Sequence, residues 1–181
     1  HPIEVEVHHP REIDEIFDAI SYQKGASVIR MLHEYLGEAD FKKGLHDYLT
    51  KHSYGNAATA DLWEALEQAS SKPVSKIMGA WTSLPGHPVV NFDFNKEHTT
   101  ITQSRYFADP RAKADTATWP IPLDIQHGLL MEDAKLIFNA GVKNDFKPNR
   151  GQTGFYVVGY TEEWLKNLSP QLSSPDFPVV D

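Results

Sequence analysis

Apolar residues recur every three or four positions through the first half of the chain, which is the spacing of one helix face. The first seven residues instead alternate between apolar and polar positions and predict a short strand. Pro10 opens the first of five predicted helices, Gly37 ends the second, and Ser21 and Thr59 are the predicted N-caps of the second and fourth. Short connections between successive helices predict an antiparallel helical array. The residues predicted to face inward are Ile13, Ile16, Phe17, Ile20, Val28, Ile29, Leu32, Tyr35, Leu36, Phe41, Leu45, Tyr48, Leu49, Leu62, Trp63, Leu66, Val74, Ile77, Met78 and Trp81.

The pattern changes from helical to alternating at residues 84–88, Leu-Pro-Gly-His-Pro. Beyond this point, alternating segments are separated by turn residues at the spacing of a small antiparallel β-sandwich. The predicted strands are residues 89–94, 99–106, 120–125, 136–138 and 154–160. The prolines of residues 119–122 cannot donate ladder hydrogen bonds, so that strand is expected at an edge or a bulge.

These patterns predict an α+β fold in three parts. Residues 1–85 form a helical part, residues 86–160 form a β-sandwich domain, and residues 161–181 begin a further helix at Trp164 and Leu165. The chain starts with His1 rather than methionine and ends in an apolar stretch, so we expect it to be an internal piece of a longer protein.

Composition narrows the class of protein. With 40% hydrophobic residues, the 181-residue chain can bury a core. A net charge of −8 argues against a nucleic-acid or anionic-membrane partner. No apolar run approaches the roughly 18–20 residues that a membrane helix needs. The sequence has no cysteine, which fits a reducing, cytoplasmic compartment and excludes a cysteine metal site.

Nine histidines invite a search for a metal site. A zinc-protease helix needs His-Glu-x-x-His, because two imidazoles four residues apart reach one ion from one face. The only His-Glu pair is His33-Glu34, and Gly37 stands where the second histidine would be. His8 and His9 are neighbours on a predicted extended segment and point to opposite faces. We therefore expect no metal site in this chain, and the residues alone predict an acidic α+β protein without a self-contained active site.

One segment is more specific. Residues 15–32, Glu-Ile-Phe-Asp-Ala-Ile-Ser-Tyr-Gln-Lys-Gly-Ala-Ser-Val-Ile-Arg-Met-Leu, resemble the stretch of gluzincin M1 zinc aminopeptidases that carries the active-site tyrosine. Further segments resemble the same family in the same order, so that the resemblance covers roughly residues 1–168 and is greatest to its puromycin-sensitive and tricorn-interacting branch. These segments are residues 1–3, 56–63, 78–82, 86–90, 119–123 and 154–160.

The resemblance implies an architecture and an activity. Residues 1–85 would end a thermolysin-like catalytic domain, residues 86–160 would form the family's β-sandwich, and residues 161–181 would begin its C-terminal helical domain. The full-length enzyme would use zinc-activated water to attack the first peptide bond of peptide substrates and release N-terminal residues. The sequence contains neither His-Glu-x-x-His nor Gly-x-Met-Glu-Asn, so the chain alone is expected to be inactive and to bind no zinc.

Two residues receive roles from the resemblance. Tyr22 matches the tyrosine that stabilises the transition state by donating a hydrogen bond to the developing oxyanion. The alternative is a core tyrosine, which we expect of Tyr35 and Tyr48. Phe17 either lines the pocket for the N-terminal side chain of the substrate or belongs to the apolar stripe of its helix.

A different class of function stays open at this point. The chain could be a non-catalytic β-sandwich module that presents loops or an edge strand to a protein partner. The helical part could also self-associate, since the helices of a truncated domain leave apolar faces bare. A His-Glu-x-x-His motif upstream of His1 would decide for the enzyme.

Overall fold

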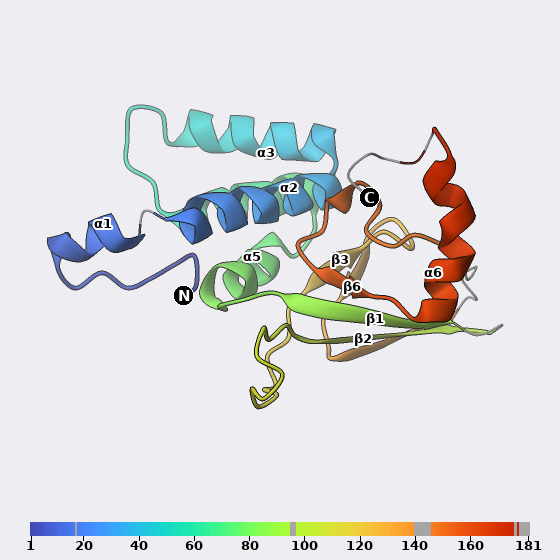
Figure 1. Cartoon of the computed structure of the whole chain (residues 1–181). Helices are drawn as coiled ribbons and strands as arrows, with labels where there is room; N and C mark the ends of the chain where they lie inside the picture. Colours follow the sequence, from blue (N-terminus) through green and yellow to red (C-terminus); the bar gives the residue numbers. More distant parts are fainter. Residues whose placement is uncertain (17, 95–96, 140–145, 176, 178–181) are drawn as a thin grey trace. The chain divides into compact units, whose positions relative to one another are not determined.

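The computed structural model describes the chain except for residues 17, 95–96, 140–145, 176 and 178–181 (Figure 1). The chain divides into two compact units, His1–Pro85 and Gly86–Asp181. The change of hydrophobic period at residues 84–88 lies at this division. The helices of the first unit and the strands of the second give the predicted α+β class.

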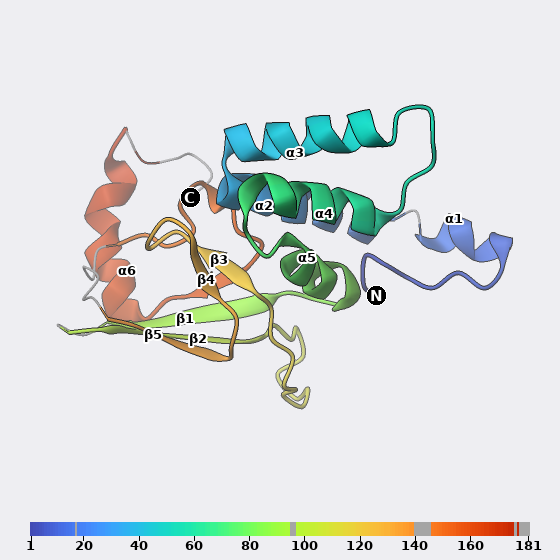
Figure 2. The same cartoon turned by 180° about the vertical axis from the view of Figure 1, so that it is seen from behind.

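The first unit consists of helices. In chain order they are η1 (Pro10–Glu12), α1 (Ile13–Ile16), η2 (Ile20–Lys24), α2 (Gly25–Leu36), α3 (Glu38–Lys51), α4 (Thr59–Ser70) and α5 (Val74–Ser83). Helix α3 packs on α4, α4 packs on α5, and α2 contacts both α3 and α5. Figure 2 shows α3 and α4 side by side and running in opposite directions, as predicted for consecutive helices joined by a short connection.

The predicted apolar stripes of α2, α4 and α5 form the core of this unit. Their buried members include Val28, Leu32, Tyr35, Leu36, Trp63, Leu66, Val74, Ile77, Met78 and Trp81. Two predictions of inward-facing residues are wrong, because the side chains of Ile13 and Leu49 are 41% and 64% exposed. Helix α3 approaches α4 through the buried Gly44, and Leu49 lies about 140° further round the same helix.

Three further predictions, of one strand and two helix N-caps, are also wrong. Residues 1–7 form no strand; Glu4 makes a single backbone hydrogen bond, from its N–H to the Thr82 carbonyl oxygen at 3.0 Å. Ser21 lies inside η2 rather than at its start. Thr59 is the first residue of α4, and the carboxylate of Asp61 accepts the Ala58 N–H at 2.7 Å instead. An acidic side chain in the first helical turn can reach back to a free backbone N–H, and it replaces the predicted hydroxyl cap.

The second unit contains two sheets and a helix. Its strands are β1 (Pro88–Phe94), β2 (Thr99–Arg105), β3 (Ile121–Leu123), β4 (Leu129–Met131), β5 (Lys135–Phe138) and β6 (Val157–Gly159), followed by α6 (Glu162–Leu168). Two short 3₁₀ turns, η3 (Arg150–Gln152) and η4 (Ser169–Ser173), complete the elements. All five predicted strands form, three of them shorter than expected, and β4 was not predicted.

The larger sheet is mixed rather than antiparallel. Its order is β5-β2-β1-β6, and β6 runs parallel to β1 with Val90 opposite Val158. Strands β3 and β4 form a separate antiparallel pair in which Ile121 lies opposite Met131. Among the described residues β3 pairs with β4 alone, so the proline-containing strand is an edge strand, as predicted.

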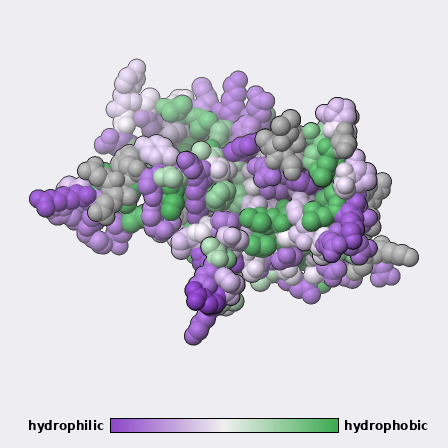
Figure 3. All heavy atoms as spheres, viewed as in Figure 1, coloured by the Kyte–Doolittle hydropathy of each residue, from purple (hydrophilic) through white to green (hydrophobic). Residues whose placement is uncertain are grey.

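A buried glutamine connects the two sheets of the second unit. Gln103 on β2 accepts the Trp119 N–H at 2.9 Å and donates to the Trp119 carbonyl oxygen at 2.8 Å, just before β3. The apolar core residues of this unit are fully or almost fully buried and include Val90, Phe92, Ile101, Trp119, Ile121, Leu123 and Met131. On the face of the molecule in Figure 3, apolar side chains appear in several separate areas divided by polar ones.

Candidate functional site

Tyr22 lies on a widened helical turn. Its side chain is 63% exposed, whereas Tyr35 is buried in the core. The turn is η2, in which the Gly25 N–H donates to the Ile20 carbonyl oxygen, five residues earlier, rather than to the residue four earlier. Such π-helical turns are rare and occur frequently at functional sites. Tyr22 is therefore presented to solvent on an unusual backbone at the start of α2.

The Asp18 carboxylate organises the beginning of this turn. Its Oδ1 accepts the backbone N–H groups of Ile20 and Ser21 at 2.9 and 3.0 Å. Its Oδ2 lies 2.8 Å from His1 Nε2. The Ser21 N–H and the His1 ring lower the pKa of Asp18, and the Pro2 carbonyl and Asp18 raise the pKa of His1.

Lys24 anchors the other end of the turn. Its side chain is buried, and Nζ donates to the Leu84 carbonyl oxygen at 2.8 Å, just beyond α5. Lysine is rarely buried without a polar partner, because its ammonium group needs hydrogen-bond acceptors. The turn that carries Tyr22 is thus held at one end by Asp18 and at the other by Lys24. Sequence reasoning identified neither residue; the only hint was an acidic residue two positions before the turn, a spacing typical of side-chain caps.

The other candidate residues provide less evidence for a functional site. Phe17, the predicted substrate-pocket residue, lies outside the described residues. His33 and Glu34, the only His-Glu pair, approach to 3.9 Å on the surface of α2. In the part of the chain that the structure describes, no group of three or more His, Cys, Asp or Glu side chains could hold a metal ion. The donor set of these residues therefore does not fit zinc.

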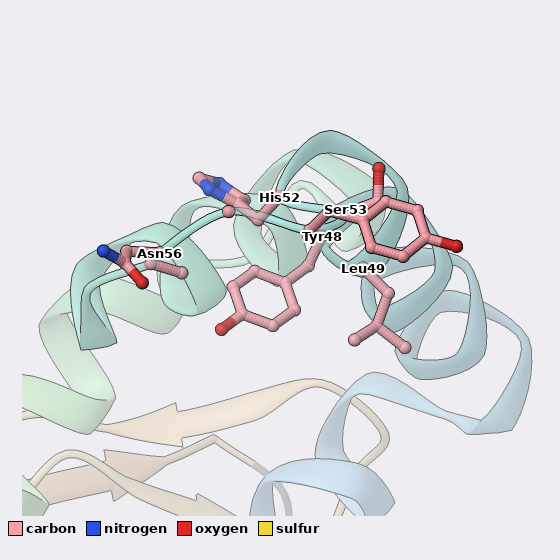
Figure 4. Close-up of a pocket in the computed structure, with 8 residues that line it drawn as sticks. Tyr48, Leu49, His52, Ser53 and Asn56 are labelled. Carbon is pink, nitrogen blue, oxygen red and sulfur yellow. The ribbon is translucent and has the colours of Figure 1, made fainter.

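A hollow of about 550 Å³ lies elsewhere, at the C-terminal end of α3. Its lining residues are Tyr48, Leu49, His52, Ser53, Tyr54, Gly55, Asn56 and Ala57. In Figure 4, Tyr48 and Leu49 point to one side of the helix end, and the centroids of the Tyr48 and His52 rings lie 5.3 Å apart. Tyr22 is not among the residues that line this hollow. We therefore place the candidate site at η2 and not at this hollow.

No helix within the described ranges combines the length and the apolar character that crossing a membrane requires.

Comparisons with known proteins agree on one family. Residues 1–81, which contain η2, match the Peptidase family M1 domain. An alanine/arginine aminopeptidase of Saccharomyces cerevisiae is 41% identical over 179 residues, covering 94% of this chain and 21% of that protein. A tricorn protease-interacting factor F2 of Thermoplasma volcanium is 42% identical, covering 95% of this chain and 22% of that protein. A puromycin-sensitive aminopeptidase of Caenorhabditis elegans is 39% identical, covering 100% of this chain and 21% of that protein.

The chain spans about a fifth of the length of the curated relatives it matches. The similarity to them extends over nearly all of the chain, through both compact units, and the predicted resemblance is confirmed. On this basis the chain belongs to the peptidase M1 family, whose similar members are named aminopeptidases.

Proposed function

We propose that this chain is part of a metallo-aminopeptidase that removes N-terminal residues from peptides, and that its contribution to the reaction is Tyr22. The observation that carries the proposal is an exposed tyrosine on a π-helical turn, inside the segment that matches the M1 peptidase domain. Two of the three similar proteins described above are named aminopeptidases, which supports the enzyme; the third is named as a factor that interacts with the tricorn protease, which points to a protein partner.

The role we assign to Tyr22 follows from the charge that develops during peptide cleavage. When the carbonyl carbon of the first peptide bond is attacked, negative charge grows on the carbonyl oxygen. A hydroxyl group near that oxygen donates a hydrogen bond that strengthens in the transition state. The 63% exposure of Tyr22 allows a substrate to approach its hydroxyl group, while η2 fixes its backbone.

The parts of the proposed enzyme follow the expected family order. Residues 1–85 belong to the end of the catalytic domain, residues 86–160 to a β-sandwich domain, and residues 161–181 to the start of a C-terminal helical domain. Membership of the M1 family implies zinc in the whole enzyme. Because the described residues do not fit a zinc site, its ligands would have to come from other parts of the protein. The substrate-pocket role of Phe17, a cytoplasmic location and self-association of the helical part stay predictions.

The test is the substitution Tyr22→Phe in the full-length enzyme, which removes the hydroxyl group and keeps the ring. Loss of one oxyanion donor is expected to lower kcat by about 10²–10³-fold. KM should change little, because the lost interaction is made mainly in the transition state. Tyr54→Phe is the matched control, since Tyr54 is fully exposed in the connection between α3 and α4. Turnover of the Tyr22→Phe enzyme within a few-fold of the control, at equal zinc content, would overturn the assignment.

A further inference from the structure

We propose that Asp18 is a positioning residue that holds the turn carrying Tyr22 in its reactive geometry. The proposal rests on the proposed function of Tyr22 and assigns Asp18 no contact with substrate. Its basis is a set of hydrogen bonds in which Asp18 contacts three consecutive residues of η2 and a histidine from the start of the chain.

The first step concerns the backbone of the turn. Asp18 Oδ1 accepts the N–H groups of Ile20 and Ser21, and the Asp18 carbonyl oxygen accepts the Tyr22 N–H at 3.2 Å. Three successive backbone N–H groups, the last belonging to Tyr22, therefore donate hydrogen bonds to Asp18. The Ile20 and Ser21 N–H groups have no partner within the helix at its beginning, and the aspartate side chain suits them by hydrogen bonding and by charge. The Tyr22 N–H binds the main-chain carbonyl oxygen of Asp18.

The second step concerns the other carboxylate oxygen. Oδ2 lies 2.8 Å from His1 Nε2, and His1 Nδ1 lies 2.6 Å from the Pro2 carbonyl oxygen. Both ring nitrogens of His1 face acceptors, so both donate only when the ring is the imidazolium cation. The Pro2 carbonyl and Asp18 favour this charge and raise the pKa of His1, whereas Lys24 opposes it. An ion pair of this kind fixes the rotation of the carboxylate, and Oδ1 stays aimed at η2.

The third step concerns the exposure of Tyr22 within the turn. Tyr22 and Gln23 are exposed, and within η2 only Lys24 is buried. The backbone from which the Tyr22 side chain extends is held by the hydrogen bonds to Asp18. A catalytic group displaced by about 1 Å can lose up to about 10²-fold in rate.

The experiment is a double-mutant cycle in the full-length enzyme. Asp18→Ala should lower kcat about tenfold in the otherwise unchanged enzyme, with KM within about twofold. The same substitution should change kcat by less than about twofold in a Tyr22→Phe background, because the hydroxyl group it positions is already gone. Asp18→Asn keeps an acceptor for the Ile20 and Ser21 N–H groups and should restore most of the lost turnover. Asp47→Ala is the matched control, because Asp47 is an aspartate on α3 whose side chain pairs with Lys43 at 2.7 Å.

The outcomes separate the two proposals. Near-normal turnover of the Tyr22→Phe enzyme contradicts the function proposed for Tyr22. A large effect of Tyr22→Phe, together with equal losses from Asp18→Ala in the two backgrounds, contradicts only the positioning role; so does a loss below about twofold from Asp18→Ala. If circular dichroism shows that Asp18→Ala does not fold, Asp18→Glu is measured in the same two backgrounds. It keeps the charge but moves the carboxylate, and the same tenfold and twofold expectations apply.

Discussion

The ammonium group of Lys24 donates a hydrogen bond to the carbonyl oxygen of Leu84, with Nζ and O 2.8 Å apart. The two residues are sixty positions apart in the sequence, and the bond joins the turn that carries Tyr22 to the end of α5. The Lys24 side chain is only 7% exposed, so the lost interaction could not be replaced freely by water. We therefore expect a substitution of Lys24 to lower the free energy of unfolding substantially.

Lys24→Met should destabilise the first unit by about 1.5–3 kcal/mol, since it keeps most of the side-chain volume but removes a charged donor from the part-buried Leu84 carbonyl. Lys43→Met is the matched control: Lys43 forms an exposed ion pair with Asp47 one turn away, and such pairs contribute about 0.3–0.5 kcal/mol. Urea unfolding followed by helical circular dichroism measures the two changes. Equal destabilisation by the two substitutions would contradict the anchoring role of Lys24.

Two glycines in helices should respond to alanine in opposite directions. A Cβ atom at Gly44 would lie 2.8 Å from Leu66 Cδ2 and 2.9 Å from Leu66 Cα, where α3 and α4 meet. Because backbone atoms cannot move aside cheaply, Gly44→Ala is expected to destabilise the unit by about 1–3 kcal/mol. At Gly79 in α5 a Cβ atom would meet nothing within 4 Å, so Gly79→Ala should stabilise by about 0.5–1 kcal/mol. Thermal unfolding of the two variants checks the sign of each change, and stabilisation by Gly44→Ala would show that the helices are not in close contact there.

Helical periodicity predicted the parts of the fold that depend on local sequence. The apolar stripes of α2, α4 and α5 are long and regular, and their residues form the core. Strand β4 has only three residues, Leu129–Met131, with no alternation to detect. The parallel pairing of β1 with β6 joins residues more than sixty positions apart, so tertiary contacts rather than local pattern decide it.

The candidate site was predictable to a smaller extent. Periodicity alone does not distinguish Tyr22 from Tyr35, and only the resemblance of residues 15–32 singled out Tyr22. The roles of Asp18 and Lys24 depend on His1 and Leu84, which are 17 and 60 positions away from them in the sequence. Buried polar connections such as Gln103 with Trp119 are equally invisible to hydrophobic patterns, because a glutamine in a strand is normally expected on the solvent face.

The 181-residue chain by itself is expected to hold no zinc in stoichiometric amount and to hydrolyse no aminoacyl reporter substrate. The reason is its donor set: the sequence has no His-Glu-x-x-His, and the described residues contain no cluster of metal ligands. Metal analysis after dialysis and a fluorogenic aminoacyl assay measure the two properties, with the full-length enzyme as the positive control. One tightly held zinc ion per chain, or hydrolysis abolished by a chelator, would contradict the expectation.

The ion pair of Asp18 and His1 should stabilise the turn within a limited range of pH. Hydrogen bonds from the Ser21 N–H and from His1 lower the pKa of Asp18 below its ordinary value of 3.8. The contribution of Asp18 to the stability of the fold is therefore fully present above pH 3.8. It is lost as the pH falls through the lower pKa that Asp18 has in the folded protein. The Pro2 carbonyl and Asp18 raise the pKa of His1 above 6.5, so its contribution is present below pH 6.5 and is lost as the pH rises through the higher folded value.

It follows that the pair contributes most to the stability of the fold between about pH 4 and pH 6.5, and that a change in the charge of Asp18 should change the pKa of His1. Asp18→Asn removes the negative charge beside His1, so the pKa of His1 should fall in an NMR titration of its ring protons. The Pro2 carbonyl, the largest cause of the raised pKa of His1, is not changed by this substitution. An identical His1 titration in the two proteins would mean that the carboxylate and the imidazole are not paired in solution, and it would remove the second step of the argument for Asp18 as a positioning residue.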